Sequence, residues 1–228
     1  MPDWTAPQRP NSYTEQSLVN AILDGTFPAG SSLPGERTLS AQLGVTRPTL
    51  REAIQRLSRD GWLTVRQGKP TLVNNYWREG GLNVLSALVQ YSQQLPPDFV
   101  PNLLEVRRQL APAYTRAAVV HAPGEALACL NGYEDLADTA VAFAHFDWQL
   151  HHHLTIICGN PIYTLILNGF AGFYEELAQL YFARPQARQT SRQFYADLAT
   201  AVSQQDATLA EQITREAMEQ SLALWQNI

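Results

Sequence analysis

Two arginines stand one helical turn apart in the stretch LGVTRPTLREAIQRL, residues 43–57, with two threonines beside them. Arg47 and Arg51 repeat at the i, i+4 spacing, so in a helix their side chains share one face. A guanidinium group can donate two parallel hydrogen bonds to a guanine base or a phosphate. Thr46 and Thr49 add hydroxyl groups that can reach a phosphate or a base edge. This pattern is typical of a helix that contacts nucleic acid.

A short helix, a turn and a second helix are expected to position these side chains. Residues 36–43 have a helical pattern that Gly44 ends, and Thr46 can cap the helix that follows. Pro48 is tolerated in the first turn of that helix, which is expected to run to about Asp60. The face away from the arginines is apolar and consists of Leu50, Ala53, Ile54 and Leu57.

An earlier helix and a later hairpin complete a small domain. Residues 12–24 carry apolar residues at helical spacing and are followed by Gly25. After Gly61, the segment WLTVRQGKPTLVNN alternates β-forming residues on both sides of residues 67–69, which predicts a short hairpin with Gly68 at its tip. Three helices, a tight helix–turn–helix link and a hairpin predict a winged helix, a geometry that seats side chains in the major groove of DNA.

Beyond Tyr76 the sequence has only helical periodicity. The segment YWREGG is interpreted as a connector. Helices are expected at about residues 82–94, 98–121, 123–141, 142–158, 161–182, 187–204 and 206–226. The predicted fold class is mainly α: an N-terminal winged helix-turn-helix domain with a small β-hairpin wing, and a C-terminal antiparallel bundle of about seven helices. The predicted domains are residues 1–75, a linker at 76–82 and residues 83–228.

The charge is unevenly distributed between these parts. Residues 1–77 contain 8 Arg and Lys against 6 Asp and Glu, whereas residues 78–228 contain 8 against 15, which gives the net charge of −5. This asymmetry suggests a small part that meets polyanions and a larger part that does not. No apolar run approaches the roughly 20 residues of a membrane span, and a signal peptide is not expected. Cys129 and Cys158 are interpreted as reduced thiols of a cytoplasmic protein.

These motifs together resemble a known family. The segment LPGERTLSAQLGVTRPTLREAIQRLSRDGWLTVRQGKPTLVNN resembles the DNA-binding domain of the GntR family of bacterial regulators. The strings NNYW, NLLEVRRQ, GNPIYTLILNG and LYFARPQAR are similar to the fatty-acid-responsive branch of that family. The resemblance implies a cytoplasmic homodimer that binds double-stranded operator DNA, represses fatty acid degradation genes and activates fatty acid synthesis genes. It also implies that long-chain acyl-CoA, bound in the helical domain, releases the DNA, and that no cofactor and no membrane are involved.

The resemblance also assigns site residues. It places the DNA contacts on Arg37, Thr46, Arg47, Thr49, Arg51, Gln67 and Gly68. It places ligand binding or signal relay on Arg107, Tyr174, Tyr181, Tyr195, Ser221 and Trp225. Pro48 stands where close relatives have threonine, and Gln67 where they can have histidine, so the operator sequence is expected to differ slightly. Met218 and Gln220 replace a glycine and a glutamate, and a lysine expected beyond Ile228 is absent. The contacts to the nucleotide part of the acyl-CoA are therefore expected to differ.

Plainer interpretations remain open for several of these residues. Arg56 and Arg59 leave the groove-facing row and are interpreted as charges on the solvent or dimer side. Each aromatic residue of the second domain, taken alone, can equally fill a helical core. An acyl-CoA nevertheless needs an apolar channel for its chain, arginines for its phosphates and an aromatic face for its adenine, and the second domain contains all three kinds of residue.

The segment DWQLHHHL offers a metal alternative. Asp147 and His151 lie one helical turn apart, and many relatives outside the fatty-acid branch complete such a metal site with two later histidines. No histidine follows His153, and Tyr195 occupies one of the later positions, so we expect no metal and a polar core pair instead. The rival functions are a GntR-type repressor that senses a different small carboxylic acid or a metal-bound organic acid, and an α-helical metal hydrolase. Since no Ser–His–Asp elbow, P-loop or dinucleotide glycine motif is present, we do not expect an enzyme.

Overall fold

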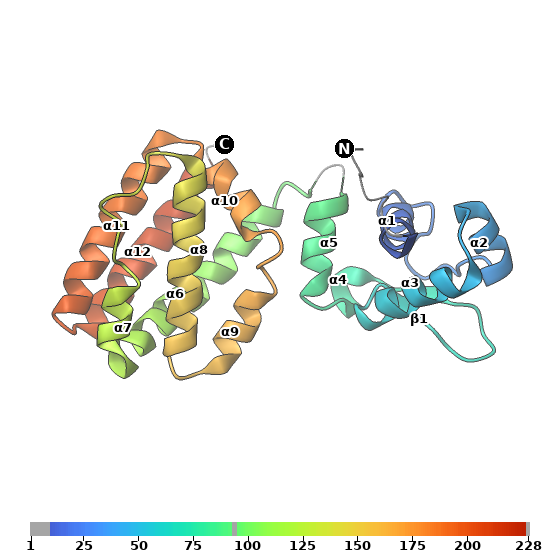
Figure 1. The fold of residues 1–228 in the computed structure, drawn as a ribbon, viewed down its shortest axis with the longest axis horizontal. Coiled ribbons are helices and arrows are strands. Elements are labelled where there is room, and N and C mark those ends of the chain that lie inside the picture. Colours follow the sequence, from blue (N-terminus) through green and yellow to red (C-terminus); the bar gives the residue numbers. More distant parts are fainter. Residues whose placement is uncertain (1–9, 93–94, 227–228) are drawn as a thin grey trace, which may run out of the picture. The chain divides into compact units, whose positions relative to one another are not determined.

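The computed structural model describes residues 10–92 and 95–226 of the chain (Figure 1). Contacts divide the chain into two compact units, residues 1–95 and 96–228. Within the described residues there are twelve helices and one two-stranded sheet. The elements of the first unit are α1 (Pro10–Leu23), α2 (Glu36–Leu43), α3 (Arg47–Arg59), β1 (Leu63–Thr64), β2 (Leu72–Val73), α4 (Tyr76–Glu79) and α5 (Asn83–Tyr91). Those of the second are α6 (Phe99–His121), α7 (Pro123–Ala128), α8 (Ala140–Ile157), α9 (Pro161–Asn168), α10 (Tyr174–Phe182), α11 (Pro185–Ser203) and α12 (Ala207–Gln226).

The first unit has the winged helix that the sequence predicts. Helix α3 packs against α1, α2 and β1. Strands β1 and β2 are antiparallel, with Leu63 opposite Val73 and Thr64 opposite Leu72. The buried apolar side chains of this unit include Leu18, Val19, Ile22, Leu33, Leu39, Leu50, Ala53, Ile54, Leu57, Trp62, Leu63 and Val73. One small core therefore fixes α3 and the hairpin together.

Helices α4 and α5 also pack within the first unit. A Cβ atom at Gly61 would lie 2.6 Å from the Glu79 carbonyl oxygen, so the backbone after α4 passes the end of α3 more closely than a side chain allows. Helix α5 buries Val84 and Leu88 and contacts α1. The sequence predicts a linker at residues 76–82 and a second domain from residue 83, whereas contacts group both helices with the first unit.

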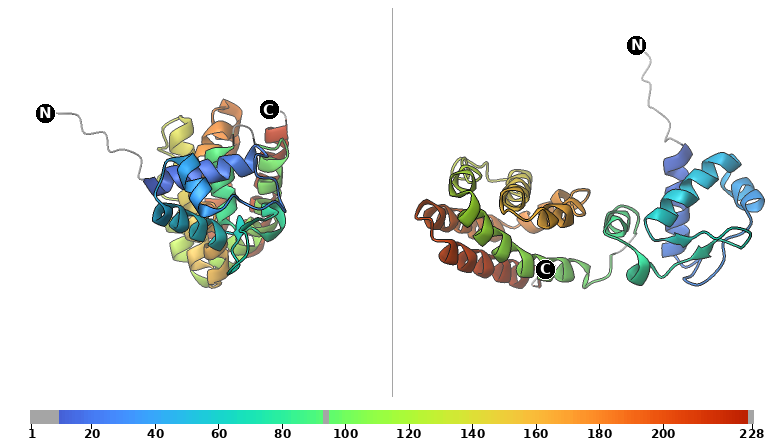
Figure 2. Two further views of the ribbon diagram at one scale, coloured as in Figure 1. Left: turned by 90° about the vertical axis from the view of Figure 1, so that its right-hand side faces the viewer. Right: turned by 90° about the horizontal axis from the view of Figure 1, so that it is seen from below.

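The second unit is a helical bundle, which agrees with the predicted fold class. Helices α6 and α12 lie side by side in both Figure 1 and Figure 2, α8 packs against α6 and α10, and α11 packs against α12. Its largest fully buried side chains include Tyr114, Phe143, Phe182 and Tyr195. Pro112 lies buried inside α6. Because proline has no backbone N–H, it cannot donate the helical hydrogen bond to the carbonyl four residues earlier.

The prediction of a helix at residues 123–141 is wrong beyond its first turns. Helix α7 ends at Ala128, and no further helix begins before Ala140. Gly132 has a φ of +86°, which is incompatible with a continuing right-handed helix. Arg192 of α11 donates hydrogen bonds of 2.9–3.0 Å to the backbone carbonyls of three residues in this loop, Tyr133, Glu134 and Leu136. A distant side chain thus satisfies backbone groups that a helix would have paired internally.

The helix expected at residues 161–182 is also interrupted. Helix α9 ends at Asn168 and α10 begins at Tyr174, with turns between them. This break contains Gly169 and Gly172, and glycine is about 1 kcal/mol less favourable than alanine within a helix. Phe173, at the end of the break, is buried. Apolar residues keep helical spacing across the interruption, so the sequence pattern does not reveal it.

Candidate functional site

Local backbone and capping fix the helix–turn–helix link. Gly44 ends α2 with a φ of +66°, a left-handed conformation that glycine adopts without steric cost. Thr46 caps α3, because its side-chain oxygen accepts a hydrogen bond from the Thr49 backbone N–H at 3.3 Å. The two threonine hydroxyl groups also hydrogen bond to each other at 2.9 Å. The predicted turn and cap are therefore present.

Helix α3 has one buried and one exposed face. Its core face consists of Leu50, Ala53, Ile54 and Leu57. Arg47 and Arg51 are exposed, and 64% of the Arg51 side chain is accessible to solvent. Arg51 Nε donates to Glu36 Oε2 of α2 at 2.7 Å. Both guanidinium groups are thus presented outward, as a groove-reading helix requires.

The other residues predicted to contact DNA are also on the surface. Arg37 is exposed in the first turn of α2. Gln67 and Gly68 are exposed in the loop between β1 and β2, where Gly68 has a φ of +70°. Arg56, by contrast, forms an ion pair with Glu15 of α1 at 2.9 Å. That pairing fits its interpretation as a charge outside the groove-facing row.

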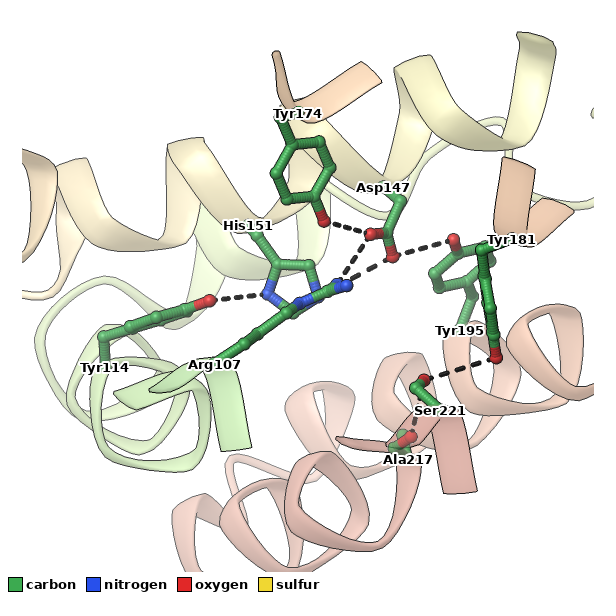
Figure 3. Close-up of polar contacts among 9 residues, drawn as sticks. All are labelled: Arg107, Tyr114, Asp147, His151, Tyr174, Tyr181, Tyr195, Ala217 and Ser221. Atoms are coloured by element: carbon green, nitrogen blue, oxygen red, sulfur yellow. Dashed lines mark hydrogen bonds and ion pairs between the residues drawn. The ribbon is translucent and has the colours of Figure 1, made fainter. Parts of the chain in front are cut away.

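A buried carboxylate lies among side chains from several helices of the second unit (Figure 3). The Asp147 side chain, on α8, is 5% exposed. Its Oδ2 accepts a hydrogen bond from Arg107 Nη2 of α6 at 2.6 Å and one from the Tyr174 hydroxyl of α10 at 2.5 Å. Its Oδ1 accepts one from the Tyr195 hydroxyl of α11 at 3.1 Å. One carboxylate therefore joins four helices.

His151 extends this polar cluster one turn further along α8. The Tyr114 hydroxyl lies 2.8 Å from His151 Nδ1, while His151 Nε2 lies 3.7 Å from Asp147 Oδ1, too far for a hydrogen bond (Figure 3). The arrangement fits the tautomer in which Nδ1 accepts from Tyr114 and Nε2 carries the proton, facing the carboxylate.

Burial and charge set the protonation states in the cluster. Burial opposes ionisation of Asp147, but the Arg107 guanidinium holds the pKa of this carboxyl below its ordinary value. Burial first, and then the Arg107 charge, lower the pKa of His151 to about 3. Burial raises the pKa of both Tyr174 and Tyr195. At neutral pH the cluster consists of one ion pair, a neutral imidazole and neutral phenols.

An apolar cavity of about 100 Å³ adjoins the cluster. Five of the six predicted ligand-site residues line it: Arg107, Tyr174, Tyr181, Ser221 and Trp225. The Tyr181 hydroxyl donates to Ser221 Oγ at 3.3 Å, and the Ser221 hydroxyl donates to the Ala217 carbonyl at 2.9 Å. Tyr195, the sixth, is fully buried and meets the cluster through Asp147. The apolar cavity and the polar cluster thus adjoin each other at Arg107.

Sequence reasoning missed the residue at the centre. Asp147 and His151 were considered only as metal ligands or a polar core pair, and Tyr114 was not singled out. The available signal was an aspartate within the largely apolar segment AVAFAHFDW. Its partners lie 27 to 48 residues away in the chain, on other helices, so spacing could not identify them. Of the two departures in α12, Met218 is buried in the core and Gln220 is exposed.

The Arg107 guanidinium group lies directly beside the Asp147 carboxylate. Arg107 supplies a positive charge next to one carboxylate oxygen, and the Tyr195 hydroxyl donates to the other. Among residues 10–92 and 95–226, no three His, Cys, Asp or Glu side chains are grouped so that they could hold a metal ion. The Asp147 carboxylate is already bound by one guanidinium group and two phenol hydroxyl groups.

Family models match both parts of the chain. The model described as bacterial regulatory proteins of the gntR family matches residues 11–73, and that of the FadR C-terminal domain matches residues 74–228. The chain belongs to the FadR branch of the GntR family. In this FadR-type chain the C-terminal match includes α4 and α5, although contacts group those two helices with the first unit.

Curated relatives match over most of the chain. A "Fatty acid metabolism regulator protein" of Shewanella pealeana is 42% identical over 219 residues, which are 96% of this chain and 92% of the relative. Proteins of the same name from Shewanella denitrificans and Pasteurella multocida are 47% and 39% identical, over 83% and 97% of this chain and 79% and 92% of theirs. These relatives are named as regulators, and the family model describes bacterial regulatory proteins. This chain is therefore a transcription regulator and not an enzyme.

A solved structure supports the fold. The structure titled "Lar controls the expression of the Listeria monocytogenes agr system and mediates virulence" has a TM-score of 0.65 and is 14% identical, with 99% of this chain and 100% of that chain covered. At this identity the likeness concerns the fold alone. Among the described residues, no helix combines the length and the apolar character that crossing a membrane requires.

Proposed function

We propose that this FadR-type chain regulates fatty acid metabolism by binding operator DNA, and that long-chain acyl-CoA releases it. The regulator would repress fatty acid degradation genes and activate fatty acid synthesis genes. The observation that carries the proposal is the combination of an outward-facing arginine row on a winged helix with an apolar cavity lined in part by the half-buried Arg107. The name shared by its relatives, fatty acid metabolism regulator, supports the metabolic part.

The DNA-binding surface follows from the two arginines of α3 and the residues around them. Arg47 and Arg51 lie one turn apart and exposed, where α3 would enter a major groove, and each bidentate arginine–guanine pair contributes about 1–3 kcal/mol of base discrimination. The Thr46 and Thr49 hydroxyls at the helix start suit a phosphate. Arg37 would approach from α2, and the loop with Gln67 and Gly68 would approach the minor groove.

The effector proposal rests on the cavity and its size. Each buried CH₂ group contributes about 0.8 kcal/mol, so a chain of about fourteen carbons contributes on the order of 10 kcal/mol before ordering costs. The cavity of about 100 Å³ is smaller than ordinary ligand pockets, which span roughly 300–1,000 Å³. A long acyl chain must therefore separate the helices around the cavity, and a ligand that binds the separated state better shifts the protein toward it.

The helices that would move are those joined by the polar cluster. Arg107, Asp147 and Tyr174 tie α6, α8 and α10 together at the edge of the cavity. Tyr181 and Ser221 link α10 to α12 in the same way. Because both sets of bonds adjoin the cavity, separation of its walls would break some of them, and so ligand binding would change how α6, α10 and α12 are joined.

A regulator of this kind would act as a homodimer in the cytoplasm, where its DNA lies. A two-fold symmetric dimer matches operators with two half-sites. We propose that the regulator acts without a cofactor.

A mobility-shift titration tests the proposal. The wild-type chain is bound to a duplex that it has selected from a random-sequence pool, and acyl-CoAs with 4, 8, 12, 16 and 18 carbons are added. We expect chains of about twelve carbons or more to release the DNA and shorter chains to fail, with free coenzyme A as the negative control. Release that is independent of chain length, or no release at all, would refute the effector assignment.

A variant at Arg51 tests the DNA-contacting surface. Arg51→Ala is expected to weaken binding to the selected duplex about five- to hundredfold and to relax the preference at one base position. Equal losses on the selected and a scrambled duplex would exclude a base-reading role for this residue.

A further inference from the structure

The ion pair between Glu36 and Arg51 places an acidic side chain within the surface that would meet DNA. Glu36 is the first residue of α2, where the helix macrodipole favours a negative charge. Its Oε2 accepts a hydrogen bond from Arg51 Nε at 2.7 Å, across the helix–turn–helix link. An acidic group here repels the phosphates of any DNA, so its presence beside a base-reading arginine requires an explanation.

The contact occupies only one edge of the guanidinium group. Nε of Arg51 is bound to Glu36, while neither terminal nitrogen, Nη1 nor Nη2, has a hydrogen-bond partner among residues 10–92 and 95–226. These two nitrogens form a planar pair that matches the O6 and N7 acceptors of guanine. The carboxylate therefore holds the side chain without using the atoms that would read a base.

Stability does not explain the pair. The side chains of Arg51 and Glu36 are 64% and 41% exposed. Ion pairs as exposed as this one contribute little to folding, because water screens the charges and both side chains lose conformational freedom.

We propose that Glu36 is a positioning residue that orients Arg51 for base reading and thereby raises sequence specificity. The proposal rests on the DNA-binding function proposed above. A free arginine loses side-chain freedom when it binds a base, whereas an arginine already held by Glu36 loses less, and only at a base that fits the held orientation. The negative charge meanwhile weakens binding to all sequences alike. This uniform effect cancels in the ratio between two duplexes, so the orientation of Arg51 alone favours the correct operator over other DNA.

The chain provides a matched control. Arg56 and Glu15 form a second exposed arginine–glutamate pair in the same unit, at 2.9 Å, and Arg56 lies outside the predicted DNA contacts. Glu15→Ala therefore removes an equivalent surface pair and the same charge without affecting Arg51. Thermal unfolding of both alanine variants shows whether the fold is intact.

The test measures dissociation constants by fluorescence anisotropy. The probes are a duplex selected from a random pool by the wild-type chain and a scrambled duplex of the same composition. The specificity ratio, scrambled over selected, is expected to fall about two- to tenfold in Glu36→Ala. It is expected to fall less in Glu36→Gln, whose amide oxygen still accepts from Nε, and to stay at the wild-type value in Glu15→Ala. In an Arg51→Ala background, Glu36→Ala is expected to change the ratio no further.

The outcomes separate the two proposals. If the wild-type selection converges on no sequence, the proposed DNA-binding function fails, and the role of Glu36 fails with it. If the wild-type chain is selective but Glu36→Ala keeps its ratio while binding both duplexes more tightly, Glu36 is only a repelling charge and the positioning role is wrong. A fall in the ratio of equal size with and without Arg51 also overturns it, because the effect then does not act through that arginine.

Discussion

Acidification from pH 7 to pH 5 is expected to destabilise the second unit through His151. The His151 side chain is 1% exposed, and burial together with the Arg107 charge lowers its pKa from 6.5 to about 3. In the unfolded chain the imidazole binds a proton near pH 6.5, so between about pH 3 and 6.5 the unfolded state binds more protons than the folded state. A folded-state pKa below the unfolded value means that stability is highest above pH 6.5 and falls as the pH falls.

The size of the effect follows from the distance between pH 5 and the unfolded-state pKa. Each pH unit in this window costs about 1.4 kcal/mol, so the free energy of unfolding should fall by roughly 2 kcal/mol between pH 7 and pH 5. Asp147 does not contribute over this range. Its pKa lies below the ordinary aspartate value, so the stability it provides is lost only at pH values below about 4.

Urea unfolding of the full chain at pH 7, 6 and 5, followed by far-ultraviolet circular dichroism, measures this loss. His151→Gln keeps a neutral polar side chain that can bond to the Tyr114 hydroxyl but cannot bind the proton. The wild type should lose roughly 2 kcal/mol more than this variant between pH 7 and pH 5. His153→Gln, an exposed residue of the same helix, is the control and should behave as the wild type does. Equal losses in the wild type and His151→Gln would refute the reasoning.

Three further perturbations test particular contacts. Asp147→Ala should lower the free energy of unfolding, measured in urea, by about 3–5 kcal/mol because Arg107 loses its buried partner. Arg107→Met combined with Asp147→Leu should recover most of that loss. Equal losses in the single and the double variant would contradict this. Gly61→Ala should cost about 2–4 kcal/mol in thermal unfolding, since a left-handed φ of +90° adds to a backbone clash, and Gly68→Ala, with open space around it, should cost less. Arg192→Met should speed protease cleavage in the α7–α8 loop because three carbonyls lose their donor, and unchanged cleavage by mass spectrometry would argue against that clamp.

The winged helix could be predicted from the sequence because its signals are local. Gly44, Thr46 and the apolar spacing of α3 each determine backbone or packing within a few residues. The Arg51–Glu36 pair was not predicted, because it depends on how two helices cross. The sequence places a linker at residues 76–82 from the segment YWREGG, whereas in the structure the end of α4 lies in close backbone contact with Gly61 of the first unit.

The polar cluster of the second unit could be predicted only in part. Family resemblance supplied Arg107, Tyr174 and Tyr195, but not the carboxylate that joins them. An aspartate in an apolar helix indicates a buried partner, yet any of several arginines could have filled that role. The interruptions at residues 129–139 and 169–173 were missed because helical periodicity continued on both sides, while tertiary hydrogen bonds and glycines determine where the helices end.

Pro112 divides α6 into two mechanically different halves. The missing N–H leaves the Arg108 carbonyl without its helical donor, so the helix resists bending least just beyond Arg107, the residue that ties it to α8. A force that separates Arg107 from Asp147 therefore acts on α6 next to the point where the helix bends most easily. Bending there would change the direction of residues 99–107 relative to the later turns of α6, which bury Ala111, Tyr114 and Ala118.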